Sequence, residues 1–312
     1  MSIYRLKPTC KDYLWGGHKL IEEYGVDYSG DICAEAWVLS GHKDGASVIC
    51  TDKGDMTLPD FISTQGKEIL GERCIQLKEF PLIIKLIDAK KSLSIQVHPD
   101  DEYARIHEGQ LGKTEMWYVL QADDGAFLYQ GFSHSIDKSE FEQRIKDNTL
   151  EEVLNKVFVK PGDVVFIEPG TLHSIGAGIL LLEVQQSSNV TYRIYDYGRL
   201  GADGKPRDLH IRQALDVTKL DKPDASVPSK GDSVVTCEYF DVKSIRVTGD
   251  SPYTGFTDKR SFACLLVTEG EGRVDSVDSS FPVKKGDALF VPADDGVYTC
   301  SGDFEVIITS IP

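Results

Sequence analysis

Two segments of this 312-residue chain repeat each other, and this repeat constrains the fold more than any other feature of the sequence. The segment "KPGDVVFIEPGTLHSI" begins at Lys160 and "KKGDALFVPADDGVYT" begins at Lys284, with a Gly-Asp turn, an apolar run and a Pro in nearly the same order. A similar strand pair precedes each copy, from Glu115 in the first and from Phe262 in the second. Such repetition is typical of β-sandwiches and jelly-roll barrels. The repeat therefore predicts two related β units.

The rest of the chain has the same character. Short β-branched and aromatic segments such as "VVFIEPG" and "ILLLEV" alternate with Gly, Asp and Pro turns, which favours a mainly β, antiparallel fold. Helices are expected over residues 57–70, as an insert near 138–157, and after Asp208. In the insert, Ser139 and Glu142 are spaced as a capping box ahead of an apolar stripe that continues to Val157.

A linker divides the two predicted units. Residues 221–232 are rich in Pro, Lys, Asp and Ser, a composition typical of loops. We therefore expect a first unit over 1–220, which carries the helical insert, and a second unit over 233–312.

Composition excludes several classes of function. A formal net charge of -16 argues against a nucleic-acid partner, because phosphate binding needs clustered Lys and Arg. Apolar runs such as 179–182 are far shorter than the roughly 20 residues that span a bilayer, and the first ten residues contain no apolar signal segment, so a cytoplasmic protein is expected. The seven cysteines are scattered and never form a CxxC pair, so neither a disulfide framework nor a thiolate zinc site is expected.

The stretch "SLSIQVHPDDEY", from Ser92, points to a metal site. Ser94, Gln96 and His98 alternate with apolar residues, so a strand places all three on one face. The repeat brings Glu115 and His173 into the same barrel, whereas the second copy has Phe262 and no His at the corresponding positions. The other five histidines lack such partners and are interpreted as structural or solvent-facing: His18, His42, His107, His134 and His210.

The predicted ligand set is therefore Gln96, His98, Glu115 and His173. Imidazole nitrogens with carboxylate and amide oxygens suit a divalent first-row ion that keeps one position open for water or substrate. Zinc is favoured, and manganese, iron and cobalt also fit this set.

Several longer motifs resemble the type I phosphomannose isomerases, in their short bacterial form within the cupin superfamily. In order along the chain they are "YLWGGHKL", "AEAWVLSGH", "PLIIKLIDAKKSLSIQVHPDDEYA", "GKTEMWYVL" and "EPGTLHSIGAGILLLEVQQSSNVTYRIYDYGR". The resemblance implies two cupin-type jelly-roll units, the second degenerate, and reversible isomerisation of mannose 6-phosphate to fructose 6-phosphate. It implies one zinc ion per chain on the same four ligands. It also implies pocket positions at Lys85, Ser94, Lys113, Glu183, Arg193 and Arg199.

The chemistry of an aldose-ketose isomerisation assigns roles to these residues. A proton must move between C2 and C1 through an enediol, so a base and a stabiliser of oxygen charge are needed. Lys113 shares a strand face with Glu115 and is one candidate base. Glu183 is another, because its apolar surroundings raise a carboxyl pKa unless the carboxylate is paired; the alternative for Glu183 is a buried ion pair, perhaps with Arg193. Metal-bound hydroxide is a third candidate. Arg193 is expected to stabilise the oxygen charge. No Walker or Rossmann glycine motif occurs, so Arg193, Arg199 and Lys85 are the expected phosphate contacts.

Two alternatives from other classes are retained. An iron-dependent cupin dioxygenase would keep the metal, although such enzymes usually present an HxH pair where this chain has Gln96 and His98. A non-catalytic sugar-binding cupin would not need all four ligands. The sequence leaves the oligomeric state open between monomer and homodimer.

Overall fold

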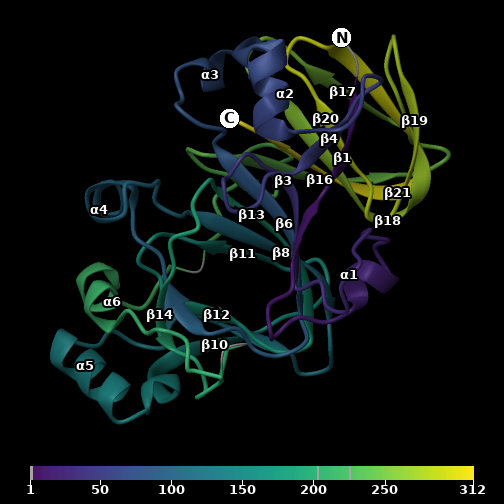
Figure 1. Cartoon of the computed structure of the whole chain (residues 1–312). Coiled ribbons are helices and arrows are strands. Elements are labelled where there is room, and N and C mark those ends of the chain that lie inside the picture. The colour runs from purple at the N-terminus through teal and green to yellow at the C-terminus, as the bar shows by residue number, and fades with distance from the viewer. Residues whose placement is uncertain (1–2, 202–203, 225) are drawn as a thin grey trace.

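A computed structural model describes residues 3–201, 204–224 and 226–312 and shows three antiparallel sheets. The middle layer in Figure 1 is a six-stranded sheet that carries much of the first unit. Its strands, in spatial order, are β11 (Val164–Ile167), β8 (Glu115–Ala122), β13 (Ile179–Gln186), β6 (Leu82–Ala89), β3 (Glu35–Ser40) and β2 (Thr9–Lys11).

A five-stranded sheet faces one side of the middle sheet and completes the first barrel. Its strands, in spatial order, are β10 (Leu154–Phe158), β9 (Phe127–Phe132), β12 (His173–Ile175), β7 (Ile95–Val97) and β14 (Tyr192–Tyr195). Ile87, Trp117 and Leu181 of the middle sheet pack with Leu128 and Ile175 of this sheet. Because side chains alternate along a strand, Lys85, Glu115 and Glu183 point to the same interior as these apolar residues.

A ten-stranded sheet covers the other side of the middle sheet and forms the second unit. Leu86 and Leu182 from the middle sheet pack against Cys264, Leu266 and Phe290 in a buried core. The strands are β15 (Val235–Thr236), β16 (Asp241–Val247), β21 (Gly296–Ser310), β18 (Ala263–Asp275), β20 (Ala288–Val291), β1 (Tyr4–Lys7), β4 (Val48–Cys50) and β5 (Met56–Thr57), with β17 (Tyr253–Thr257) beside β21 and β19 (Ser280–Lys284) beside β18.

The predicted mainly β fold is confirmed, and the ten-stranded sheet adds a connection that the repeat did not indicate. The N-terminal strand β1 pairs with β20, with Tyr4 opposite Phe290, and with β4 on its other side. The start of the chain thus belongs to the sheet of the second unit. The boundary at 221–232 stays a prediction, but sheet pairing crosses it.

The helices are short and lie outside the sheets. They are α1 (Lys19–Glu22), α2 (Leu58–Gln65), α3 (Glu72–Ile75), α4 (Asp101–His107), α5 (Lys138–Lys146) and α6 (Ile211–Val217), with 3₁₀ turns η1 (Lys67–Leu70) and η2 (Leu150–Val153). The helix expected over 57–70 is divided by Gly66, whose φ of 93° is left-handed. The short helix expected after Asp208 is confirmed as α6.

The prediction of a continuous helix over 138–157 is wrong. Helix α5 ends at Lys146, and Val157 lies in strand β10. The predicted capping box is also wrong, because Asp137 is the N-cap and its carboxylate accepts a hydrogen bond from the Glu140 N–H at 2.8 Å. Most of the apolar residues of this segment, from Phe141 to Leu154, pack in one core beneath the five-stranded sheet, whereas Val157 packs in the barrel interior. The shared core explains why the spacing looked helical.

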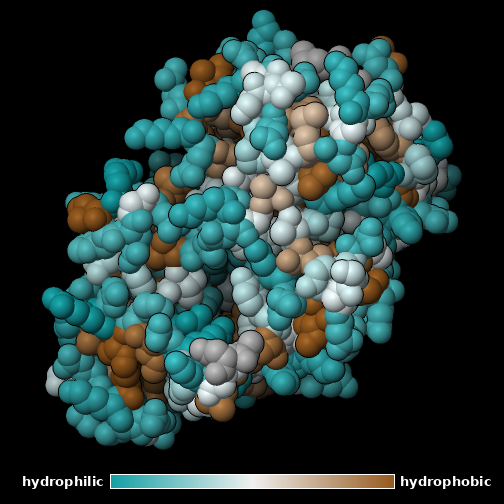
Figure 2. Space-filling view, in the orientation of Figure 1, coloured by the Kyte–Doolittle hydropathy of each residue, from teal (hydrophilic) through white to brown (hydrophobic). Residues whose placement is uncertain are grey.

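The surface agrees with the acidic composition. Figure 2 shows hydrophilic side chains over most of the visible face, with hydrophobic residues in scattered patches. In the part of the chain that the structure describes, no helix is both long and apolar enough to cross a membrane. All seven cysteines are free thiols, as the sequence predicted.

Candidate active site

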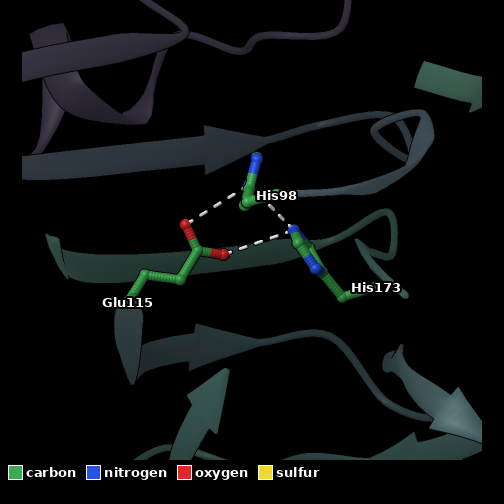
Figure 3. Close-up of side chains that lie close together, drawn as sticks. All are labelled: His98, Glu115 and His173. Atoms are coloured by element: carbon green, nitrogen blue, oxygen red, sulfur yellow. Dashed lines mark hydrogen bonds and ion pairs between the residues drawn. The ribbon is translucent and has the colours of Figure 1, made fainter. Parts of the chain in front are cut away.

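Three of the four predicted metal ligands meet inside the first barrel. His98 follows β7, Glu115 opens β8 and His173 opens β12, and all three side chains are buried. His173 Nε2 lies 3.2 Å from His98 Nε2 and 3.3 Å from Glu115 Oε1, and His98 Nε2 lies 3.6 Å from Glu115 Oε2. Figure 3 shows these atoms turned toward one common point. A metal ion placed at that point could contact all three residues.

The outer nitrogens of both imidazoles show why a cation fits here. His98 Nδ1 lies 2.8 Å from the Val190 carbonyl oxygen, and His173 Nδ1 lies 2.8 Å from the Thr171 carbonyl oxygen. A carbonyl only accepts, so each Nδ1 carries the proton and each Nε2 presents a lone pair. Burial lowers the pKa of both rings, to about 4 for His173, which keeps them neutral.

Two facing lone pairs and a buried carboxylate repel one another unless positive charge lies between them. Neither oxygen of Glu115 accepts a hydrogen bond of good geometry from the described residues. The nearest cation is the ammonium of Lys113, 2.7 Å from Glu115 Oε2 and 3.1 Å from His98 Nε2. Burial raises the pKa of Glu115 to about 7, against the opposing effect of Lys113. The donor set therefore fits a divalent metal ion.

Gln96 lies next to this group. Its backbone in β7 is opposite His173 of β12, and its Nε2 lies 3.4 Å from His173 Nε2. Its Oε1 accepts a hydrogen bond from Ser94 Oγ at 3.3 Å. A half-turn of the amide would aim Oε1 at the histidine cluster, so the structure gathers all four predicted ligands.

Charged residues continue from the ligands along the wall of the barrel in a buried series of alternating sign, which we term the charge ladder: Glu35, Lys85, Glu183 and Lys113. Lys85 Nζ lies 3.0 Å from Glu183 Oε1 and 3.5 Å from Glu35 Oε2. Lys113 Nζ lies 3.9 Å from Glu183 Oε1, and Trp117 Nε1 donates to Glu183 Oε2 at 2.9 Å.

The ladder keeps Glu183 ionised. Burial alone would raise its pKa, but Lys113 and Lys85 outweigh burial and hold the pKa at about 2. The sequence allowed two outcomes for Glu183, a raised pKa in apolar surroundings or a buried ion pair, perhaps with Arg193. The structure shows the ion pair, but the partners are Lys85, on the facing position of β6, and Lys113. Lys85 responds in the opposite direction: burial lowers its pKa, and Glu183 and Glu35 raise it by more.

A cavity of about 270 Å³ opens beside the ladder and the ligands. Six of the sequence-predicted residues line it: Lys85, Ser94, Gln96, Lys113, Glu183 and Arg193. Sequence reasoning missed the others that line it with polar or aromatic groups: Tyr13, Trp15, Glu35, Asn189, Thr191, Arg207 and His210. A second cavity of similar volume, about 280 Å³, lies in the second unit, and no histidine lines it.

Arg193 and Arg199 have different surroundings. Arg193 lies in β14 opposite Gln96, and its Nε donates to Ser94 Oγ at 3.3 Å. Arg199 does not line the cavity, because it binds the Asp196 carboxylate and donates to the Ser92 carbonyl oxygen. Of the predicted pocket residues, Arg199 is therefore the one that the structure does not bring to the cavity.

Comparisons with known proteins agree with this arrangement. Residues 3–126 match the family model described as phosphomannose isomerase type I, catalytic domain, and residues 230–311 match mannose-6-phosphate isomerase, cupin domain. A mannose-6-phosphate isomerase of Streptococcus mutans is 35% identical over 301 residues, covering 94% of this chain and 93% of that protein. One from Bacillus subtilis is 35% identical over 320 residues, covering 98% of both.

Solved structures show the same relationship. The crystal structure of the mannose 6-phosphate isomerase from Bacillus subtilis matches with a TM-score of 0.91 and 33% identity, covering 99% of both chains. A putative mannosephosphate isomerase from Archaeoglobus fulgidus, 22% identical, shares the fold with a TM-score of 0.81. These relatives do not favour the dioxygenase or the non-catalytic alternative. The chain belongs to the type I phosphomannose isomerases, built from cupin-type β units.

Proposed function

We propose that this chain interconverts mannose 6-phosphate and fructose 6-phosphate at the cavity beside His98, Glu115 and His173, with one bound zinc ion. The observation that carries this proposal is the pair of imidazole Nε2 lone pairs 3.2 Å apart beside an ionisable carboxylate. Such a group is stable and chemically useful when a divalent cation joins it.

Zinc is the metal we propose, with Gln96 as the fourth ligand. Two imidazoles, one carboxylate and one amide oxygen leave room for substrate oxygens. A zinc-bound mannose 6-phosphate isomerase of solved structure shares the fold, with a TM-score of 0.78 and 19% identity. Manganese, iron and cobalt also suit these ligands.

The isomerisation needs charge stabilisation at two neighbouring oxygens of the open-chain sugar. A bound divalent ion supplies positive charge to oxygens on which negative charge develops. Arg193 lies on the strand next to β7 and reaches the same cavity, so its guanidinium adds a fixed charge-assisted donor. Ser94 bonds both Arg193 and Gln96 and thus fixes the orientation of the two side chains relative to each other.

The proton that moves between C1 and C2 is assigned to Lys113. Glu183 also lines the cavity, but a carboxylate with a pKa near 2 that binds Trp117 and Lys85 is a weak base. Lys113 is closer to the ligands, and in its neutral amine form it would take the proton from one carbon and return it to the other. We expect Lys113→Ala to abolish turnover and Glu183→Gln to lower it, both with the metal content intact.

Substrate contacts are proposed for Lys85 and Ser94 within the cavity. Arg199, whose guanidinium binds Asp196 and the Ser92 carbonyl oxygen, is proposed to act on the site only by positioning Asp196. The charge of Lys85 is shared between Glu35 and Glu183, so we assign it to sugar hydroxyls near the ladder. Cytoplasmic location and the oligomeric state stay predictions.

The first test is isomerisation of mannose 6-phosphate by the purified protein as isolated, after chelation and after zinc is returned. Loss on chelation and recovery with zinc are expected. His98→Ala should lose activity and metal, whereas His134→Ala, which changes an exposed histidine outside the site, should keep both. Turnover that survives complete metal removal would contradict the proposal.

A further inference from the structure

Strand register shows where the cavity of about 280 Å³ lies within the second unit. In the first unit Glu115, the first residue of β8, is opposite Ile167 of β11. In the second unit Ala263, the first residue of β18, is opposite Val291 of β20. Ile167 and Val291 are the eighth residues of the two repeated segments. Ala263 therefore occupies the position of Glu115, one residue after the Phe262 that the sequence indicated, and it lines the cavity.

The neighbouring strands correspond in the same way (Figure 1). The strand order β6–β13–β8–β11 in the first unit matches β16–β21–β18–β20 in the second. Lys85 of β6 is opposite Glu183 of β13. Lys243 of β16 is opposite Ile308 of β21, and Glu183 and Ile308 hold the same register against β8 and β18. Lys243 therefore corresponds to Lys85, and both Lys243 and Ile308 line the second cavity.

Tyr298 occupies the position of a predicted metal ligand. In the first unit His173 is opposite Gln96 of β7, and in the second unit Tyr298 is opposite Gly255 of β17. A Cβ atom at Gly255 would collide with the Tyr298 ring. The ring thus fills the space that a side chain at position 255 would need, and it lines the cavity.

Thr257 has a buried hydroxyl without a partner. It lies two residues after Gly255, just as His98 lies two residues after Gln96. Thr257 lines the cavity and is 4% exposed, and its Oγ1 makes no hydrogen bond within the described parts of the chain. A buried hydroxyl in this state reduces stability until a ligand supplies a partner. The second cavity therefore has the position of the first, with a hydroxyl and a phenol in place of two imidazoles.

The charges around this cavity balance one another. Three cations and three carboxylates lie at or beside it: Arg73, Lys243, Arg260, Asp232, Asp241 and Asp258. Lys243 Nζ lies 2.7 Å from an Asp232 oxygen, and Arg260 Nη2 lies 2.7 Å from an Asp258 oxygen. Among the described residues, the only group of His, Cys, Asp and Glu that could hold a metal ion lies in the first barrel. The cavity thus offers neither a metal site nor a surplus of positive charge for a phosphate group.

We propose that this cavity is a second ligand site, which binds a neutral monosaccharide. The Thr257 hydroxyl and the Lys243 ammonium can hydrogen-bond to sugar hydroxyls. The rings of Tyr253 and Tyr298 line the cavity with centroids 6.4 Å apart, and the negative face of an aromatic ring suits the C–H groups of a sugar. A volume of 280 Å³ is at the lower end of the range for small-molecule sites, roughly 300–1,000 Å³, and suits one sugar ring. No step of the proposed isomerisation uses this site.

Saturation-transfer NMR with free mannose as the probe tests this site on the metal-loaded protein. Thr257→Val keeps the shape of the side chain and removes the hydroxyl, so the Kd for mannose should rise about 3- to 10-fold, the loss expected for one neutral hydrogen bond. Thr254→Val is the matched control, because Thr254 lies in the same strand but is exposed and does not line the cavity. It should leave the Kd unchanged. Ala263→Leu fills the cavity and should abolish binding.

The free energy of unfolding of Thr257→Val provides a second measurement. In the sugar-free protein, replacing a hydroxyl that has no partner by a methyl group should leave this free energy unchanged or raise it. A fall relative to Thr254→Val would show that the hydroxyl supports the fold rather than a ligand, and the inference would be wrong.

Binding at the catalytic cavity gives a different pattern. A Kd for mannose that changes with Ser94→Ala but not with Thr257→Val would overturn the inference, and so would a wild type that binds no mannose. Binding of inorganic phosphate that Ala263→Leu removes would indicate an anion site instead and would also overturn it. If the wild type lacks isomerase activity but binds mannose in a Thr257-dependent manner, the proposed function fails and this inference stands.

Discussion

Replacing Lys85 by Met tests whether burial determines how much the ion pairs of the charge ladder contribute to the free energy of unfolding. Lys85 Nζ lies 3.0 Å from Glu183 and 3.5 Å from Glu35, and its side chain is 5% exposed. Methionine keeps much of the packing against the Trp37 ring but leaves two buried carboxylates without their shared cation. Removing one partner of a buried ion pair costs about 3–5 kcal/mol, because the remaining charge is neither solvated nor paired. We expect the free energy of unfolding to fall by that amount.

Lys160→Met is the matched control, because distance and burial make opposite predictions for it. Lys160 Nζ lies only 2.7 Å from Asp163 Oδ1, but its side chain is 79% exposed. If distance alone determined the contribution of an ion pair to stability, the Lys160–Asp163 pair would contribute more than the Lys85–Glu183 pair. Exposed pairs contribute at most about 1 kcal/mol, so we expect little change.

Urea unfolding followed by tryptophan fluorescence measures both variants. All three tryptophans, Trp15, Trp37 and Trp117, lie in the first unit, so the signal reports the part of the fold that contains the ladder. Adding Glu183→Gln to Lys85→Met should recover part of the lost free energy of unfolding, because one of the two unpaired buried carboxylates is removed. A loss for Lys85→Met no larger than that of the control, or no recovery in the double variant, would refute the reasoning.

Three further predictions concern single groups. Glu183 has a pKa of about 2 in the folded protein, below its ordinary value of 4.5, so its ionisation stabilises the fold fully above pH 4.5 and less and less as the pH falls toward 2. The difference in free energy of unfolding between wild type and Glu183→Gln, measured by urea unfolding at a series of acidic pH values, should therefore shrink between pH 4.5 and 2. Glu115→Gln removes the one anionic ligand and should weaken zinc binding by more than ~10-fold in competition with a chromophoric chelator, and unchanged affinity would exclude Glu115 as a ligand. A hydrogen bond with the Cys33 thiol lowers the pKa of Cys10, whereas burial raises the pKa of Cys264 to about 12. Because the thiolate is the reactive form, iodoacetamide should label Cys10 in the native protein and Cys264 only after unfolding.

The metal ligands could be predicted from the sequence because strand periodicity and the repeat both constrain them. Gln96 and His98 share a face by spacing, and the repeat places Glu115 and His173 in the same barrel. The sequence offered a buried ion pair for Glu183, perhaps with Arg193, but not its actual partner Lys85. Lys85 lies in the neighbouring strand, and register across strands is not encoded in the spacing along one strand.

The far end of the cavity was not predictable for a different reason. Arg207 and His210 lie in a connecting segment without periodicity, and only the folded contacts with Asp196 and Arg193 bring them to the cavity. The incorrect prediction of a helix over 138–157 shows a related limit. Helix α5 and Leu154, the first residue of β10, contribute to one core, so the apolar spacing continues past the end of the helix.

The pairing of β1 with β20 has a consequence for synthesis on the ribosome. Tyr4 is synthesised long before Phe290, the residue opposite it in the sheet. At roughly 5–20 residues per second, the interval is about 15–60 s. During that time the edge of β1 that later pairs with β20 has no partner, a state in which strand edges are prone to pair with other chains. The sheet that covers the catalytic barrel thus cannot be completed until β20 has left the ribosome, and the nascent chain needs protection at β1 until then.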